Sequence, residues 1–302
     1  MTVSDSRAQI VRRRSLALIS VLIAAGLVVA SSRLAAEPAQ SPSQDASEPQ
    51  ASTAGDNTQN NGYDFTRPEN SVELRSRFRS SSGTDSRTDR EIEYLRLTGR
   101  IKLDPDWKLA WFAQAQFLNK STISYDPASS TSEAGLGDST FQAALIRTLN
   151  ERWAFGFGTR LVALTAQDDL GSGKWEIMPG LGVRYSLTEW GSDSYFVPVV
   201  RYAMSFAGDP SRRNISEPQI APTLNISLPD RWFLTLYPSN DIRINYGDPV
   251  SGQTGRLFLP ADFAIGLNLT DKVLLSLEIG VPIIKDYPVY DFKTEFRVVI
   301  KN

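Results

Sequence analysis

Apolar and polar residues alternate along most of the chain from residue 72 to its end, so the pattern repeats every two residues. The clearest runs cover residues 72–79, 95–103, 107–117 and 292–301. A repeat of two is that of a β-strand with one apolar and one polar face. Globular strands usually have ~5–6 residues, whereas a tilted strand that crosses a membrane needs ~9–11. The pattern therefore predicts long strands of the membrane type.

Short turns and long polar segments alternate between these runs. The short turns cover residues 104–107, 150–153, 190–193, 229–232 and 270–273, and the longer polar segments, expected as loops, cover 80–90, 119–138, 165–174, 207–217, 247–255 and 282–288. Five short turns and six long loops give twelve strands, with both ends of the sheet on the short-turn side. Outer-membrane barrels have this asymmetry. We therefore expect an all-β fold, a closed antiparallel transmembrane β-barrel of about 12 strands.

Tryptophan follows three of the short turns, at Trp107, Trp153 and Trp232. An indole ring with its N–H suits the membrane interface, so we assign these three residues to an aromatic girdle. The alternative is a soluble β protein in which each tryptophan anchors a core, because alternation alone does not tell which face points out. Strand length, the repeated turn-tryptophan pattern and the export signal favour the barrel. Four prolines inside expected strands predict bulges or shifted strand bounds, namely Pro179, Pro198, Pro222 and Pro260.

The first 62 residues read differently from the rest. Arg12, Arg13 and Arg14 precede an uncharged apolar run at residues 16–30, which is typical of a secretory signal. The run is shorter than the ~20 residues of a spanning helix, although an uncleaved anchor is the alternative. We assign residues 1–36 to a signal peptide, 37–62 to a disordered periplasmic linker without large apolar residues, and 63–302 to the barrel. The expected location is the cell outer membrane, reached through the periplasm.

Composition narrows the function. The chain has no histidine and no cysteine, which excludes Ser-His-Asp catalysis, disulfides and most zinc and iron sites. We therefore expect no enzyme activity, no metal and no cofactor. With 32 basic and 34 acidic residues, the chain lacks the basic excess that nucleic-acid binding needs.

A succession of glycine-rich strand starts carries a family resemblance. It consists of residues 135–138 (Gly-Leu-Gly-Asp), 153–158 (Trp-Ala-Phe-Gly-Phe-Gly), 171–176 and 179–185. From about residue 130 to 302 the chain resembles the outer-membrane β-barrel family named for the MetA pathway of phenol degradation. The resemblance implies a barrel that passes aromatic or other apolar compounds. Its expected partners are outer-membrane lipid, the barrel assembly machinery and small apolar or aromatic solutes. Barrels usually end in an aromatic residue that this machinery reads, whereas here the last aromatic is Phe296.

The candidate site is the lumen. Closure places the last strand beside the first, so charged residues of both meet inside. The residues assigned to the pore lining are Arg75, Arg77, Arg96, Arg100, Arg160, Arg184, Lys293, Glu295 and Arg297. They form either a charged constriction that selects what passes or an ion-pair network that fills the barrel and fixes its seam.

Four glycines on neighbouring strands, Gly156, Gly158, Gly180 and Gly182, are assigned to one lumen wall without side chains. They leave room either for a solute path or for a bulky residue from the opposite wall. The sequence thus predicts a narrow passive channel for small solutes. The alternative is a structural or surface-interaction barrel with a plugged lumen.

Overall fold

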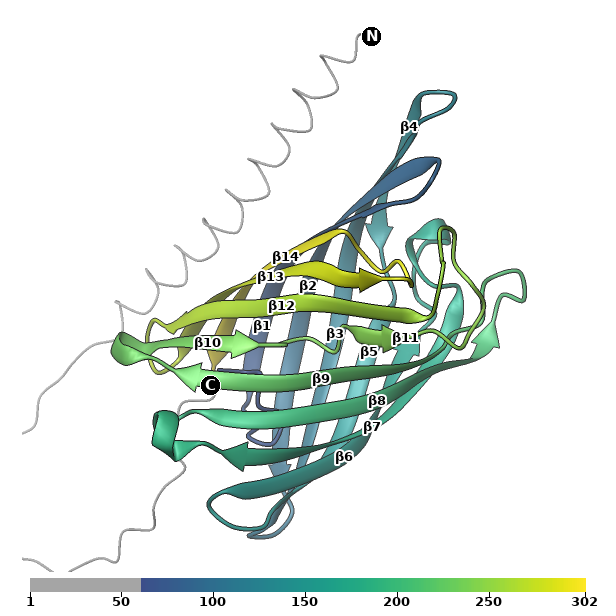
Figure 1. The fold of residues 1–302 in the computed structure, drawn as a ribbon. Helices are drawn as coiled ribbons and strands as arrows, with labels where there is room; N and C mark the ends of the chain where they lie inside the picture. Colours follow the sequence, from purple (N-terminus) through teal and green to yellow (C-terminus); the bar gives the residue numbers. More distant parts are fainter. Residues whose placement is uncertain (1–60) are drawn as a thin grey trace, which may run out of the picture. The chain divides into compact units, whose positions relative to one another are not determined.

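The computed structural model describes residues 61–302, which form one antiparallel sheet closed on itself (Figure 1). The strand segments are β1 (Ser71–Ser82), β2 (Ser86–Lys102), β3 (Trp107–Ser124), β4 (Ser129–Leu136), β5 (Ser139–Thr148), β6 (Trp153–Ala163), β7 (Lys174–Ser186), β8 (Tyr195–Gly208), β9 (Ser216–Ser227), β10 (Trp232–Leu236), β11 (Ile242–Ile244), β12 (Leu257–Asn268), β13 (Val273–Lys285) and β14 (Phe292–Lys301). Three 3-10 turns accompany them, η1 (Asp168–Leu170), η2 (Thr188–Trp190) and η3 (Pro229–Arg231). Within residues 61–302, none of the helices has the length and hydropathy that crossing a membrane requires.

The sheet closes between its first and last strands. β1 pairs with β2 on one side and with β14 on the other, where Ser71 lies opposite Lys301 and Ser80 opposite Phe292. Two pairs of segments continue one another, since β4 and β5 both pair with β3, while β10 and β11 both lie between β9 and β12. Counted in this way the barrel has twelve strands, which confirms the expected fold.

Both interruptions have local causes. Phe117 of β3 faces Leu136, but Gln114 faces Thr140, so the β4–β5 strand carries one residue more than its partner and bulges there. Between β10 and β11, residues 237–241 leave the sheet and enter the lumen, where Asp241 is buried. The second interruption therefore supplies an acidic side chain to the barrel interior.

The two faces of the sheet have opposite character. Outward side chains form an apolar surface, which includes Leu74, Leu95, Leu97, Trp111, Phe117, Phe141, Phe157, Leu181, Val200, Phe263, Leu277 and Ile283, all exposed. The interior buries charged and polar residues, among them Glu73, Glu278, Lys293, Glu295 and Arg297. A water-soluble β protein has the reverse arrangement, whereas a membrane barrel requires this one. The strand phase deduced from the alternation is confirmed.

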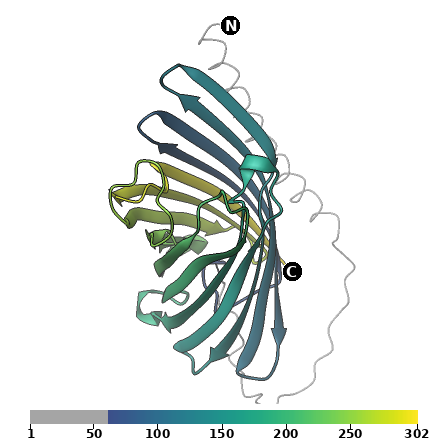
Figure 2. The ribbon, with the colours of Figure 1, turned by 90° about the vertical axis from the view of Figure 1, so that its right-hand side faces the viewer.

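The two ends of the barrel also differ, although not fully as expected. The five short turns lie where the sequence predicts them. Residues 80–90 and 119–138, however, are mostly strand, because the β1–β2 ladder continues to Ser82 and the β3–β4 ladder to Ser124. Polar residues on both faces let these hairpins extend beyond their neighbours (Figure 2).

The four prolines within expected strands do lie inside strands. Pro198 of β8 faces Pro222 of β9, and Pro179 of β7 faces Thr159. A register shift accompanies only Pro260, next to Leu259 in β12. The predicted bulge is therefore confirmed at one of the four positions.

Candidate functional site

Residues 61–70, which precede β1, line the short-turn end of the lumen. Asn61, expected in a disordered linker, is buried and donates a hydrogen bond from its amide to Asn225 Oδ1 at 2.6 Å. Its carbonyl oxygen accepts a bond from Arg297 Nη2 at 2.6 Å. The linker assignment is thus wrong for residues 61–62, because polar side chains of the lumen bind them without any apolar burial. The signal peptide and residues 37–60 lie outside the described residues.

Three side chains anchor this N-terminal segment. The Tyr63 ring lies 3.8 Å from the Arg297 guanidinium carbon, measured to the ring centroid, and burial raises the pKa of its hydroxyl, which stays protonated. Asp64, fully buried, forms an ion pair with Arg184 at 2.7 Å. Phe65 packs on the wall formed by Gly156, Gly158, Gly180 and Gly182, called the glycine wall below. A Cβ at Gly156 or Gly182 would lie 2.7 or 2.6 Å from the Phe65 ring.

The glycine wall is formed as predicted. Gly156 of β6 faces Gly182 of β7, and Gly158 faces Gly180. Of the two alternatives, the structure favours room for a bulky residue. The occupant is Phe65, however, and it comes from the N-terminal segment instead of the opposite wall.

The closure seam contains a buried ion network. The Lys293 ammonium, fully buried, contacts Asp241 at 2.6 Å, Asp262 at 2.9 Å and Glu278. One carboxylate oxygen from each of these three acids lies within 4.8 Å of those of the other two. Such a set resembles a cation site, but the lysine ammonium occupies its centre.

Next to this cluster, Glu295 of β14 pairs with Arg75 and Arg77 of β1, across the closing pair of strands. Four of the predicted pore residues, Arg75, Arg77, Lys293 and Glu295, therefore belong to ion pairs at the seam. This is the second of the two alternatives derived for them. Arg297 lies beside them and donates hydrogen bonds to Ser276 and to the backbone carbonyl oxygen of Asn61 in the N-terminal segment.

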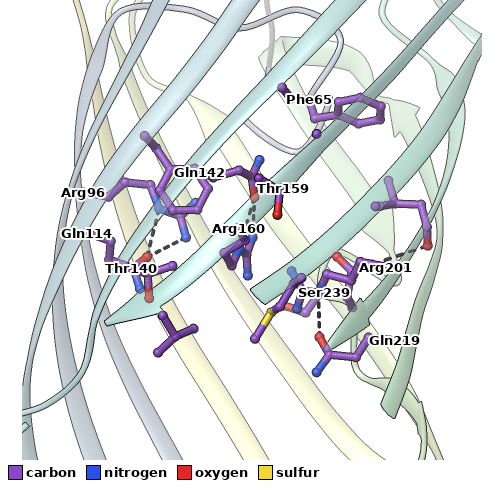
Figure 3. Close-up of a pocket in the computed structure, with 18 of the residues that line it drawn as sticks. Phe65, Arg96, Gln114, Thr140, Gln142, Thr159, Arg160, Arg201, Gln219 and Ser239 are labelled. Atoms are coloured by element: carbon purple, nitrogen blue, oxygen red, sulfur yellow. Dashed lines mark hydrogen bonds between the residues drawn. The ribbon is translucent and has the colours of Figure 1, made fainter. Parts of the chain in front are cut away.

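A different arrangement occupies the remaining wall of the lumen, shown in Figure 3. Three arginines each bind the glutamine directly opposite on the neighbouring strand: Arg96 with Gln114, Arg160 with Gln142 and Arg201 with Gln219. The Nε atoms lie 2.9, 3.1 and 2.6 Å from the respective glutamine Oε1 atoms. We call these six residues the Arg–Gln belt. A glutamine oxygen orients a guanidinium but does not neutralise its charge.

The belt borders a cavity of about 980 Å³. Its lining extends from Phe65 and Pro68 of the N-terminal segment to Ser172 and Arg213 of the long loops. The cavity therefore runs along the lumen between the two ends of the barrel.

The remaining predicted residues are placed as follows. Arg184 is buried against Asp64 at the short-turn end and does not line the cavity. Arg100 is exposed at the end of β2, where its Nη1 donates to the Pro68 carbonyl oxygen at 3.4 Å, so its assignment to the pore lining is wrong. Arg100 follows the predicted alternation of β2, but at this position the strand has already reached the rim of the barrel.

The three tryptophans lie beside the short turns, and Trp153 and Trp232 are exposed there. Trp107 is half-buried, with its ring 6.0 Å from Phe155 and the Arg147 guanidinium 5.5 Å above it. Their positions agree with an interfacial girdle, which stays a prediction.

Sequence reasoning missed several lumen residues, namely Asn61, Asp64, Arg201, Asp241 and Arg243. For Arg201 a signal existed, since it alternates with the outward Val200 and Tyr202 as the other belt arginines do with their neighbours. Asp241 carried no such signal, because it lies in the irregular segment between β10 and β11.

Residues 94–281 match the family described as "Putative MetA-pathway of phenol degradation", which is more than half of the chain. The chain belongs to this family. The resemblance drawn from its glycine-rich strand starts is thereby confirmed.

Among solved structures, the COG4313 outer membrane channel from Pseudomonas putida F1 aligns over 78% of this chain and 97% of its own length, with a TM-score of 0.60 and 17% identity. The KdgM porin aligns over 76% of this chain and 99% of its own (TM-score 0.42, 12% identity), and the NanC porin over 76% and 98% (TM-score 0.43, 13% identity). A search of curated protein sequences gave no match. At 17% identity, the similarity to the COG4313 channel shows a shared fold.

Proposed function

We propose that this family member is a passive outer-membrane channel for small solutes, with the barrel lumen as their path. One observation carries the proposal: the cavity of about 980 Å³ inside the closed sheet, which reaches from the long loops to the N-terminal segment. Charged and polar side chains line the cavity together with apolar ones, and the outer face of the barrel is apolar, as a channel in a bilayer requires. The aligned structure from Pseudomonas putida is described as an outer membrane channel, which supports this function and location.

The second candidate is a plugged barrel without transport. The observation that favours it is the N-terminal segment, which Arg184 and Arg297 hold at the short-turn end of the lumen. Neither candidate calls for enzyme activity, since the buried carboxylates Glu295 and Asp241 engage cations of the network. The two candidates differ in whether solute and ions cross.

Conductance in a planar lipid bilayer separates them. We expect the native protein, with folding verified by heat-dependent gel mobility, to give discrete conductance steps and to let small solutes swell liposomes. The variant Phe65→Ala removes the ring from the glycine wall and should raise the step size, because it widens the lumen beside the N-terminal segment. Phe141→Ala, an outward side chain, serves as the control and should conduct like native protein. A folded native barrel that gives neither steps nor swelling contradicts the channel and favours the plugged barrel.

A further inference from the structure

We propose that Arg96, Arg160 and Arg201 form a binding site for small organic carboxylates, which makes the channel selective for anions. As a statement about selectivity the proposal rests on the proposed channel function, whereas the binding site itself is a property of the lumen wall. The evidence is the charge of the wall, its geometry and the apolar surfaces beside it.

The first argument is uncompensated positive charge. Among residues 61–302, Arg160 and Arg201 form no ion pair, and each donates its hydrogen bonds to a neutral glutamine. Arg160 has Arg201, Arg96 and Arg75 as charged neighbours, whereas Arg201 has Arg243 and the acids Asp241 and Glu217 around it. The nearest carboxylate to Arg96 is Glu73, at 4.0 Å, and Glu73 also pairs with Arg75. Placing guanidinium groups together in a partly buried wall is unfavourable unless an anion or water compensates them.

The carboxylates of the cavity are engaged elsewhere. Seven of them line it, and five pair with cations outside the belt: Asp64 with Arg184, Glu69 with Lys301, Glu73 with Arg75, Glu217 with Arg243, and Asp241 with Lys293. A sixth, Asp138, accepts hydrogen bonds from the backbone N–H groups of Ala166 and Ser172, and the seventh, Glu176, interacts with the Ser172 side chain. Among the described residues Glu73 also reaches Arg96 of the belt, at 4.0 Å, whereas Arg160 and Arg201 have no carboxylate partner and are available for an anion from solution.

The second argument is orientation. Gln114 and Gln142 each accept bonds from the Nε and one Nη of their arginine, which fixes the plane of the guanidinium. The Phe112 ring packs between two of these groups, 4.3 Å from the Arg96 carbon and 5.2 Å from that of Arg160, measured to its centroid. Guanidinium groups held in this way keep their remaining N–H donors for a ligand, and their fork geometry matches a carboxylate.

The third argument concerns the rest of the ligand. Beside the belt the cavity is lined by apolar groups without charge: Phe65, Met178, Gly156, Gly158 and Gly180. Figure 3 shows Phe65 and the three arginines around the same space. A compact anion with a carboxylate at one end and an apolar body at the other satisfies both parts of the wall. Inorganic phosphate satisfies only the charged part.

The test measures binding and selectivity separately. Benzoate, its neutral analogue benzamide and inorganic phosphate are titrated into the folded, detergent-solubilised barrel by calorimetry. Reversal potentials are recorded across bilayers with a tenfold KCl gradient. The variants are Arg160→Gln and Arg201→Gln. Arg160→Lys is added because it keeps the positive charge but lacks the planar pair of guanidinium donors. Arg87→Gln is the matched control, since it removes the same charge from an exposed site outside the cavity lining.

We expect benzoate to bind at least about tenfold more tightly than benzamide, which forms no charge-assisted hydrogen bonds with the arginines, and than phosphate, which leaves the apolar part of the wall without contact. Arg160→Gln and Arg201→Gln should each weaken benzoate binding about tenfold and move the reversal potential toward cation selectivity. Arg160→Lys should keep the selectivity but weaken binding, and Arg87→Gln should match native protein.

Three results overturn the proposal: benzoate and benzamide binding equally, phosphate binding as tightly as benzoate, or Arg160→Gln behaving like Arg87→Gln. A barrel that binds benzoate with the expected variant pattern but never conducts overturns the channel function and leaves the binding site standing. A barrel that conducts without anion preference and without benzoate binding overturns the carboxylate site and leaves the channel function standing.

Discussion

Replacing Lys293 by Met tests the buried network at the seam. In native protein the ammonium contacts three buried carboxylates. Without it, Asp241 keeps Arg243 at 3.1 Å, but Asp262 and Glu278 lose their cation. Two carboxylates within 4.8 Å repel by about 3.5 kcal/mol at an effective dielectric constant of about 20.

Proton uptake limits this loss. Protonating a carboxyl group of ordinary pKa ~4.3 costs about 4 kcal/mol at pH 7 and about 1 kcal/mol at pH 5. We therefore expect Lys293→Met to lower the free energy of unfolding by about 3–4 kcal/mol at pH 7, within the range for breaking a buried ion pair. Relative to native protein at the same pH, the deficit should shrink to about 1 kcal/mol at pH 5, because one carboxyl is then protonated at little cost.

The assay is urea-dependent unfolding in lipid vesicles, followed by gel mobility. Adding Glu278→Gln to Lys293→Met removes the repulsion and should restore most of the loss at pH 7. Lys120→Met, which removes a lysine from a partly exposed pair with Glu133, should change stability by less than about 1 kcal/mol. A Lys293→Met deficit that is absent at pH 7, or that is the same at both pH values, refutes the reasoning.

Two further predictions concern the glycine wall and the outer face. Gly182→Leu places a side chain where Phe65 packs, so it should displace the N-terminal segment and speed its cleavage by added protease without unfolding the barrel. Cleavage at the native rate counts against that packing. Leu181→Arg, at an exposed position of the apolar face, should cost about 2–4 kcal/mol in urea unfolding if it lies near the midplane, whereas Leu269→Arg beside a short turn should cost about 0–1 kcal/mol. Equal losses at the two sites contradict the assigned membrane position.

The alternation of residues determined most of what the sequence could predict. Every second side chain of a strand shares a face, so Leu74 and Phe78 pointing outward forced Arg75 and Arg77 inward. The short turns then ordered the strands, and closure brought Glu295 to Arg77. The glycine wall followed from the same phase, because Gly156 and Gly182 lie on consecutive strands.

Irregular backbone limited the rest. Asn61 and Asp64 lie in a segment without periodicity, and nothing local indicates that Arg297 and Arg184 bind it inside the barrel. Asp241 likewise reaches Lys293 only because residues 237–241 leave the sheet. Such contacts join residues far apart in sequence, so they follow from the closed barrel and not from the pattern of any single strand.

The lumen divides into two regions because it uses two kinds of partner for its cations. At the seam, carboxylates neutralise Lys293 and Arg77, which fixes those side chains and leaves them little attraction for a solute. On the cavity wall, glutamines hold Arg160 and Arg201 in place while their charge persists. A carboxylate at position 142 would order Arg160 equally well but would compete with any anion for it. A neutral acceptor orients the guanidinium without that competition. Pairing with glutamine therefore distinguishes a wall whose arginines can bind an anion from one whose arginines only form ion pairs inside the barrel.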